Sequence, residues 1–226
     1  MKTQLNTLLN RVDTRLAACA AAAGASLAVV PSSDAVIVYS GVVNLTIAST
    51  TNGLYLNVVT GVINEPGNGL GTTVPGWDVN PFSAGGLSFF NPTAPAGGVY
   101  VQRTGGGATA NLPFGTLISA ISVFGSSGGA TTGAQAFLLS SNQNIVGFRF
   151  QNEAAANQTQ FGWFRISLGT TLGGQPRLMV EYAYENTGLG INAGDTGVPE
   201  PTTFALLGVM AAGALGVRAW RGRKAA

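Results

Sequence analysis

The sequence predicts an all-β fold: an antiparallel β-sandwich body, jelly-roll-like, with an N-terminal signal helix and a C-terminal transmembrane helix. Three observations support this prediction. Runs of β-branched and aromatic residues partly alternate with polar residues, as in half-buried strands. Segments rich in Gly, Pro and Asn separate these runs, as turns require. Two apolar, Ala- and Leu-rich segments near the ends divide the chain into residues 1–35, 36–197 and 198–226.

Composition narrows the class of protein. Charged residues make up 9% of the 226 residues, against roughly 25% in typical soluble domains. Glycine is frequent, at 33 residues, and histidine is absent. The net charge of +2 comes from the two ends, because residues 36–197 hold four arginines and six carboxylates and so carry −2. This distribution argues for membrane targeting and against nucleic-acid binding.

Residues 1–35 have the pattern of a secretion signal. Lys2, Arg11 and Arg15 form a positive lead, and an apolar Ala-rich run extends from Leu16 to Val30. Ser33-Asp34-Ala35 places small residues where a signal peptidase needs them, so cleavage is expected after Ala35. A retained amphipathic helix is the alternative.

The single cysteine, Cys19, follows Leu16-Ala17-Ala18 in a pattern similar to a lipoprotein processing site. In such signals the apolar run precedes the cysteine, whereas here it follows. Cleavage after Ala35 would leave a mature protein without cysteine, and its stability would then come from β packing alone.

The body is predicted to contain nine to eleven strands and no helix. The first two runs form strands that are joined or bulged at Ser40-Gly41. The clearest strands are 36–39, 42–47, 54–59, 147–150, 160–168 and 177–185, and weaker ones are 87–90, 99–102, 117–124 and 134–139.

Two of these strands have informative faces. Phe161-Gly162-Trp163-Phe164-Arg165 is predicted to be a central strand in which Gly162 relieves crowding between aromatic rings. In the last strand, one face carries Leu178, Val180, Tyr182 and Tyr184, and the opposite face carries Met179, Glu181, Ala183 and Glu185. The second face is expected to be solvated.

The densest candidate binding site is the segment from Pro75 to Phe82. Asp78 and Asn80 are hard oxygen donors two residues apart, a spacing used in calcium loops. Trp77 could stack on the face of a sugar. The alternative is a buried tryptophan beside an Asx-turn. A single carboxylate makes a weak calcium site, so no metal site is assigned with certainty.

Catalytic machinery is hard to assemble from this sequence. The absence of histidine excludes Ser-His-Asp triads and His-ligated zinc. The one close carboxylate pair, Glu181 and Glu185, would lie about 13 Å apart along a strand, too far for a retaining glycosidase. These carboxylates are expected on the solvated face, paired with Arg149 or Arg165. The sequence therefore predicts no enzyme and no catalytic residues.

The segment after Gly197 carries the strongest functional signal. It begins with Val198, Pro199, Glu200 and Pro201, and the prolines make it stiff and extended. An uncharged run from Thr202 to Val217 follows, 16 residues long, which is marginal for spanning a bilayer. A basic tail of Arg218, Arg221, Arg223 and Lys224 would hold the end of this helix in the cytoplasm.

This order of motif, helix and basic tail resembles the PEP-CTERM sorting signal. The resemblance covers about the last 30 residues, with Pro199, Glu200 and Pro201 matching the motif that names the family. It implies that exosortase is a partner, after export by the secretion machinery and temporary anchoring in the membrane. The expected product is a structural or adhesive protein at the cell surface or in an exopolysaccharide matrix. The alternatives are an ordinary membrane anchor at this end, and a carbohydrate- or calcium-binding body.

Overall fold

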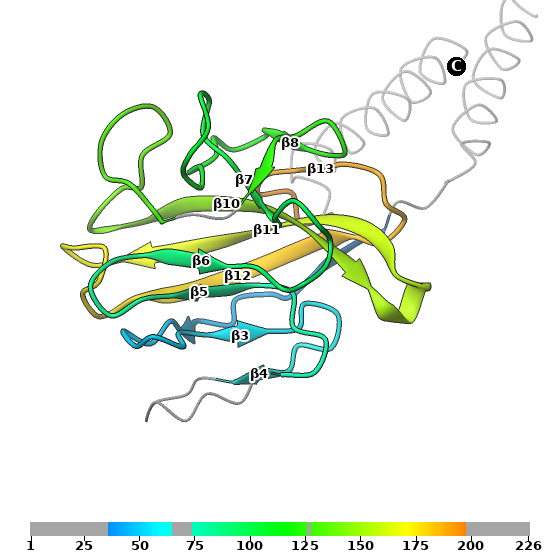
Figure 1. Cartoon of the computed structure of the whole chain (residues 1–226), viewed down its shortest axis with the longest axis horizontal. Coiled ribbons are helices and arrows are strands. Elements are labelled where there is room, and N and C mark those ends of the chain that lie inside the picture. The colour runs from blue at the N-terminus through cyan, green and yellow to red at the C-terminus, as the bar shows by residue number, and fades with distance from the viewer. Residues whose placement is uncertain (1–35, 65–73, 126–127, 198–226) are drawn as a thin grey trace, which may run out of the picture. The chain divides into compact units, whose positions relative to one another are not determined.

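A computed structural model describes residues 36–64, 74–125 and 128–197 (Figure 1). The predicted signal helix and transmembrane helix lie outside these ranges. The described residues form antiparallel strands with one 3-10 turn, which confirms the all-β prediction. The elements are β1 (Ile37–Tyr39), β2 (Leu45–Thr46), β3 (Tyr55–Leu56), β4 (Ile63–Asn64), β5 (Asn80–Phe82), β6 (Ser88–Phe90), β7 (Tyr100–Val101), β8 (Leu117–Ile118), β9 (Phe124–Gly125), β10 (Ser141–Asn152), η1 (Glu153–Ala155), β11 (Gln158–Leu168), β12 (Leu178–Glu185) and β13 (Ile191–Asn192).

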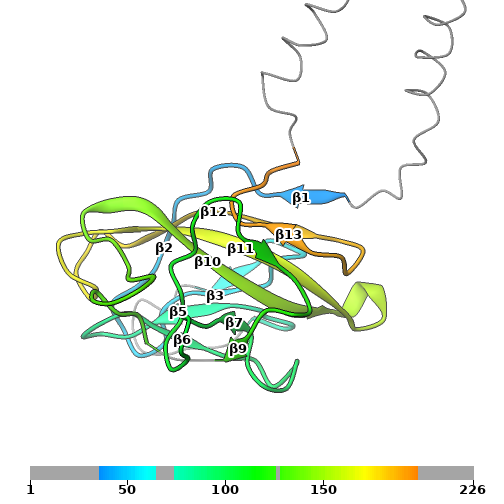
Figure 2. The same cartoon turned by 90° about the horizontal axis from the view of Figure 1, so that it is seen from above.

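A meander of the three long strands β10, β11 and β12 is the centre of the fold. It belongs to a seven-stranded sheet with the order β1-β12-β11-β10-β7-β9, in which β2 also pairs with β12. The expected interruption near Ser40-Gly41 is confirmed, because β1 and β2 pair with the same edge of β12 and Gly41 between them has a φ of +69°. Figure 2 shows β1 at this edge.

Both faces of the meander are covered. On one face, Phe148, Phe164 and Tyr182 pack with buried residues of β3 and β6. On the other face, Phe161 and Trp163 pack with buried residues of β8 and β13. Figure 1 shows β8 and β13 on one side of the long strands and β3 and β4 on the other. The sheet therefore has an apolar layer on each side.

The solvated face predicted for β12 is wrong. Glu181 is 5% exposed and Glu185 is 1% exposed, because the layer of β8 and β13 covers this face. The predicted alternation also fails at Val180. Glu181 pairs with Arg165 but Met179 pairs with Ile166, so Val180 is the extra residue of a bulge. Met179 consequently packs in the same cluster as Tyr182.

Two weaker strand predictions are also wrong. Residues 134–139 form a loop, in which Gln135 has a φ of +56° and the Leu138 amide bonds to Asn144 Oδ1. The run 117–124 is split into β8 and β9 by a turn in which the Ser122 amide donates to the Ser119 carbonyl. In both segments local hydrogen bonds replace the sheet ladder.

Gly162 lies in the middle of the central strand β11, as predicted. A Cβ atom at this position would overlap the Phe148 ring and lie 2.7 Å from the Ala183 carbonyl oxygen. Glycine is therefore required because the neighbouring strands pack directly against its backbone.

A buried arginine joins three distant segments. The Arg177 guanidinium donates to the carbonyls of Ile47, Ala48, Ser83, Gly86 and Leu172. Arg177 itself is 0% exposed. Burial lowers the pKa of this guanidinium, which nevertheless stays charged. Its five N–H groups satisfy carbonyls of loops that cross the end of β12.

The first and last described residues of the body lie side by side. The Val36 amide donates to Asn186 Oδ1, and the Asn186 amide donates to the Val36 carbonyl. A Cβ atom on Gly197 would lie 3.0 Å from Ile37 Cβ. The chain therefore enters and leaves the body at the same edge of the sheet.

Candidate functional site

Trp77 lies between two aromatic rings. Its ring meets Tyr55 edge-on, with centroids 4.9 Å apart, and stacks on Phe90 at 5.8 Å. Trp77 is partly exposed, and Phe90 is 52% exposed. One aromatic surface near the predicted site is therefore open to solvent.

Asp78 is buried and hydrogen-bonded. It is 4% exposed, and its Oδ2 accepts from the Val58 amide at 2.8 Å. Burial raises the pKa of Asp78 to about 7, because the charged form loses its hydration. The bond from Val58 acts in the opposite direction, and the nearby carboxylate of Glu153 adds to the increase.

Asn80 stabilises the turn before β3. Its Nδ2 donates to the carbonyls of Asn52 and Leu54, at 2.7 and 3.0 Å. Its backbone amide donates to the Tyr100 hydroxyl at 2.8 Å. The structure therefore brings Trp77 and Asp78, but not Asn80, to a shared cleft.

This cleft has a volume of about 230 Å³ and is lined by Gly76, Trp77, Asp78, Gln151, Glu153 and Asn157 among others. Glu153 begins η1, where the Asn152 side chain caps the turn. Gly76 has a φ of +63°, which favours glycine, and a Cβ atom there would lie 3.0 Å from Glu153 Oε1. Sequence analysis missed Glu153, because it is 75 positions from Asp78 and the Asn-Glu pattern indicates only a turn.

No set of three His, Cys, Asp or Glu side chains that could hold a metal ion occurs within the described residues. Asp78 and Glu153 supply two carboxylates, and Gln151 and Asn157 add amide groups to the same cleft. Such oxygen donors suit a hard cation such as Ca²⁺. The calcium interpretation remains a prediction.

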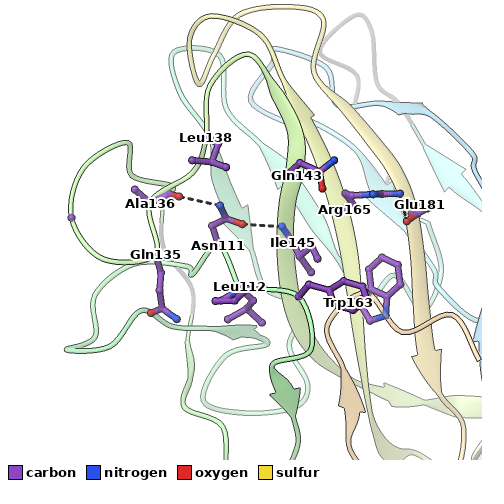
Figure 3. A pocket seen from close by; sticks show the side chains of 14 residues that line it. Asn111, Leu112, Gln135, Ala136, Leu138, Gln143, Ile145, Trp163, Arg165 and Glu181 are labelled. Carbon is purple, nitrogen blue, oxygen red and sulfur yellow. Dashed lines mark hydrogen bonds and ion pairs between the residues drawn. The ribbon is translucent and has the colours of Figure 1, made fainter. Parts of the chain in front are cut away.

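A larger groove, of about 530 Å³, lies over the opposite end of the meander (Figure 3). Its lining is both apolar and polar, and we call it the polar groove after its Gln, Arg and Glu side chains. Trp163 and Ile145 line it from the sheet, and the segments around Asn111 and Gln135 line it from the loops. Figure 3 shows the side chains of Arg165 and Glu181 meeting beside Gln143. Sequence analysis considered Glu181 as a carboxylate and Arg165 as its possible partner, but it did not predict the groove, whose residues come together only in the folded sheet.

The polar groove contains an ion pair, so the two charged side chains that line it neutralise each other. Arg165 Nη2 pairs with Glu181 Oε1, and the Tyr39 hydroxyl donates to Glu181 Oε2 at 2.6 Å. Arg165 is therefore the partner of Glu181, one of the two predicted options. The other option, Arg149, donates to the carbonyls of Ala96 and Gly98 instead.

The loop wall of the polar groove is anchored to the sheet. Asn111 Nδ2 donates to the Ala136 carbonyl at 3.0 Å, and the Ile145 amide donates to Asn111 Oδ1 at 2.9 Å (Figure 3). Asn144 Oδ1 accepts from the Leu138 amide and from Asn111. This network holds the loop 134–139 at a fixed distance from β10.

The second carboxylate of the glycosidase hypothesis lies apart from the polar groove. Glu185 Oε1 accepts from the amide and hydroxyl of Thr187, and Glu185 is not among the residues that line the polar groove. Ala183 separates it from Glu181 on the same face of β12. The two carboxylates therefore do not share a cleft.

The sorting candidates lie outside the described residues. These are Val198, Pro199, Glu200 and Pro201, the run from Thr202 to Val217, and the tail of Arg218, Arg221, Arg223 and Lys224. Within residues 36–64, 74–125 and 128–197, no helix has the length and apolar character to cross a membrane. The division of the chain at residues 35 and 197 stays a prediction.

Comparison with known proteins addresses this segment directly. The family model for the PEP-CTERM protein-sorting motif matches residues 197–224. Searches of curated proteins and of solved structures gave no match. The chain therefore carries a PEP-CTERM protein-sorting motif, and this motif indicates an exported protein that exosortase sorts from a membrane-anchored precursor.

Proposed function

We propose that this chain is a non-enzymatic structural or adhesive protein of the cell surface or of an exopolysaccharide matrix. The observation that carries the proposal is the sorting motif at residues 197–224. Its basic tail and apolar run would hold the precursor in the membrane after the secretion machinery has exported the body. Exosortase would then cut near Pro199-Glu200-Pro201 and release or attach the body.

The body supports this role in two ways. Apolar layers on both faces of the meander favour a rigid sandwich, for which a jelly-roll topology remains our prediction. The buried carboxylate of Glu181 is bonded to Arg165 and Tyr39. Oε1 of Glu185 is bonded to Thr187, while Oε2 of Glu185 has no hydrogen-bond partner among the described residues. A scaffold role is consistent with carboxylates that are held inside the fold.

Replacing Glu200 tests the sorting step. We expect Glu200→Ala to accumulate in the membrane fraction with Arg218, Arg223 and Lys224 intact, because the motif is damaged while the anchor remains. The wild-type protein should appear outside the membrane without these residues. Cell fractionation followed by mass spectrometry of the terminal peptides measures both outcomes.

Glu65→Ala serves as the matched control, since it removes the same side chain outside the motif and should be sorted like the wild type. A secreted wild-type protein that still ends in its basic tail would contradict the proposal. Equal processing of wild type and Glu200→Ala would contradict the role of the motif.

A second candidate function is calcium-dependent ligand binding at the Trp77–Asp78 cleft. The observation that favours it is the second carboxylate, Glu153, which lines the same cleft as Asp78. The partly exposed ring of Trp77 lies beside this cleft. A cation held by the cleft could also bind a hydroxyl group of a sugar, as in a lectin-like module.

The raised pKa of Asp78 makes this candidate testable through pH. Calcium must displace the proton of Asp78, whose pKa lies at about 7. Affinity should therefore rise roughly ten-fold between pH 6 and pH 8, as the ionised fraction of this group grows. Calorimetric titration of the secreted form with CaCl₂ at both pH values measures the change in affinity. The Asp78→Asn variant should lose this dependence on pH. A flat titration of the wild type at pH 8 would remove this candidate.

A further inference from the structure

We propose that the polar groove binds a neutral polysaccharide chain, with Phe114, Gln143 and the Arg165–Glu181 pair as its contact residues. The inference rests on the adhesive role proposed above and names the ligand class of that role. It assigns binding to a different place from the Trp77–Asp78 cleft.

The size and composition of the groove suit a sugar chain. Its volume of about 530 Å³ falls within the range of typical ligand pockets, roughly 300–1,000 Å³. Gln143, Arg165 and Glu181 lie on the neighbouring strands β10, β11 and β12, and Arg165 and Glu181 are directly paired in register. This polar row spans roughly 10 Å across the sheet, since adjacent strands lie about 4.8 Å apart.

The charge of the groove favours a neutral ligand. Arg165 and Glu181 neutralise each other, and the Tyr39 hydroxyl satisfies the second oxygen of the carboxylate. The Arg165 side chain is 28% exposed and that of Glu181 is 7% exposed, so the pair presents to a ligand a guanidinium whose charge is already neutralised. Amide groups such as those of Gln135 and Gln143 both donate and accept hydrogen bonds, as sugar hydroxyls do.

An exposed aromatic ring forms part of the same groove. Phe114 lines it and is 72% exposed. A Cβ atom on Gly194 would overlap the Phe114 ring, so the ring lies directly against the Gly194 backbone. A phenylalanine in this position offers a flat apolar surface to the C–H face of a pyranose ring.

Hydrogen bonds within the protein hold both walls of the groove. Asn111 links the Ala136 carbonyl to the Ile145 amide, and the Trp163 indole donates to the Asp195 carbonyl at 2.9 Å. These bonds reduce the conformational entropy that the backbone of the walls would lose on binding.

Calorimetric titration tests the proposal. The protein is the secreted form, with the full chain in a detergent that has no sugar headgroup as a second preparation. The probes are hexasaccharides of β-1,4-linked glucose, xylose and mannose and of α-1,4-linked glucose. Hexagalacturonate and an extended nonapeptide of Ser, Thr and Ala represent anionic and peptide ligands. We expect at least one neutral hexasaccharide to bind and the other two classes to give no heat.

Variants connect the binding to the groove. Phe114→Ala and Gln143→Leu should each weaken binding at least ten-fold while leaving the thermal midpoint unchanged, because both side chains are exposed. Ile121→Ala is the control, since Ile121 is 89% exposed and does not line the groove. It should bind like the wild type.

Three results would overturn the proposal: no heat with any neutral hexasaccharide, binding of only the anionic or peptide probe, or binding that Phe114→Ala leaves unchanged. The Glu200→Ala experiment measures location and this titration measures affinity. The sorting proposal can therefore fail while the polysaccharide proposal holds, or the reverse, and the two experiments show which of them has failed.

Discussion

At the scale of single residues, Arg177 shows how a charged group stabilises this body without a carboxylate partner. Its guanidinium collects five carbonyls from the segments around Ile47, Ser83 and Leu172. Hydrogen bonds from a charged donor are stronger than neutral ones, and each buried carbonyl left without a donor is costly. Arg177 therefore acts as a cross-link between loops.

Arg177→Lys tests this role. A lysine keeps the charge but has three donors on a single nitrogen, so at least two carbonyls lose their partner. The free energy of unfolding should fall by roughly 2–4 kcal/mol. Urea denaturation of the secreted form measures the change.

Arg103→Lys is the control, because Arg103 donates to the Ala134 carbonyl in an exposed setting. It should change the free energy of unfolding by less than about 0.5 kcal/mol. An equally small effect of Arg177→Lys would show that water replaces the lost donors.

The candidate binding residues Asp78 and Asn80 also show what a single residue reveals in the sequence. Asp78 and Asn80 were recognisable from the sequence as residues with oxygen ligands, but in the structure Asp78 accepts a hydrogen bond from a backbone amide and Asn80 donates through Nδ2, so their role as calcium ligands stays a prediction. Their partners were not predictable, because Val58, Asn52 and Leu54 supply backbone groups that any residue type could supply.

At the scale of secondary structure, β11 depends on the absence of one side chain. Gly162 lets the Phe148 ring and the Ala183 carbonyl lie against the backbone of the central strand. A single added methyl group has no space there unless β10 or β12 moves.

Gly162→Ala should therefore destabilise the body, by about 1–3 kcal/mol. The measurement is the midpoint of thermal unfolding, compared with Gly85→Ala. A Cβ atom on Gly85 would meet nothing within 4 Å, so that variant should unfold like the wild type. Equal midpoints for the two variants would mean that the meander adjusts freely.

The elements divide clearly into those that sequence can predict and those that it cannot. Strands β11 and β12 are 11 and 8 residues long, so β-branched and aromatic patterns have room to show. Of the 12 residues of β10 only 147–150 were predicted, because the strand begins with Ser, Asn and Gln. Strands of two residues, such as β4 and β13, carry no periodicity at all. The bulge at Val180 arises from pairing with β11, and only the partner strand reveals it.

At the scale of the whole molecule, a feature formed by one continuous segment was predictable, whereas a site formed by residues distant in the sequence was not. The sorting motif is one continuous segment, and its prediction agrees with the family match to residues 197–224. The polar groove combines Phe114, Gln143, Arg165 and Glu181 from separate parts of the chain. The burial of Glu181 and Glu185 likewise depends on β8 and β13, whose place over the sheet no single strand encodes.

The position of Gly197 has a mechanical consequence for a protein held at a surface by its C-terminal side. Tension on that side passes through residues 193–197 to β13, which is joined to β8 by only two residue pairs. It acts much later on the meander, where β10 and β11 are paired along their length. Gly194 and Asp195 lie between β13 and the point of attachment, and they contact Phe114 and Trp163. A pulling force would therefore reach Phe114 and Trp163, which line the polar groove, before it strains the meander.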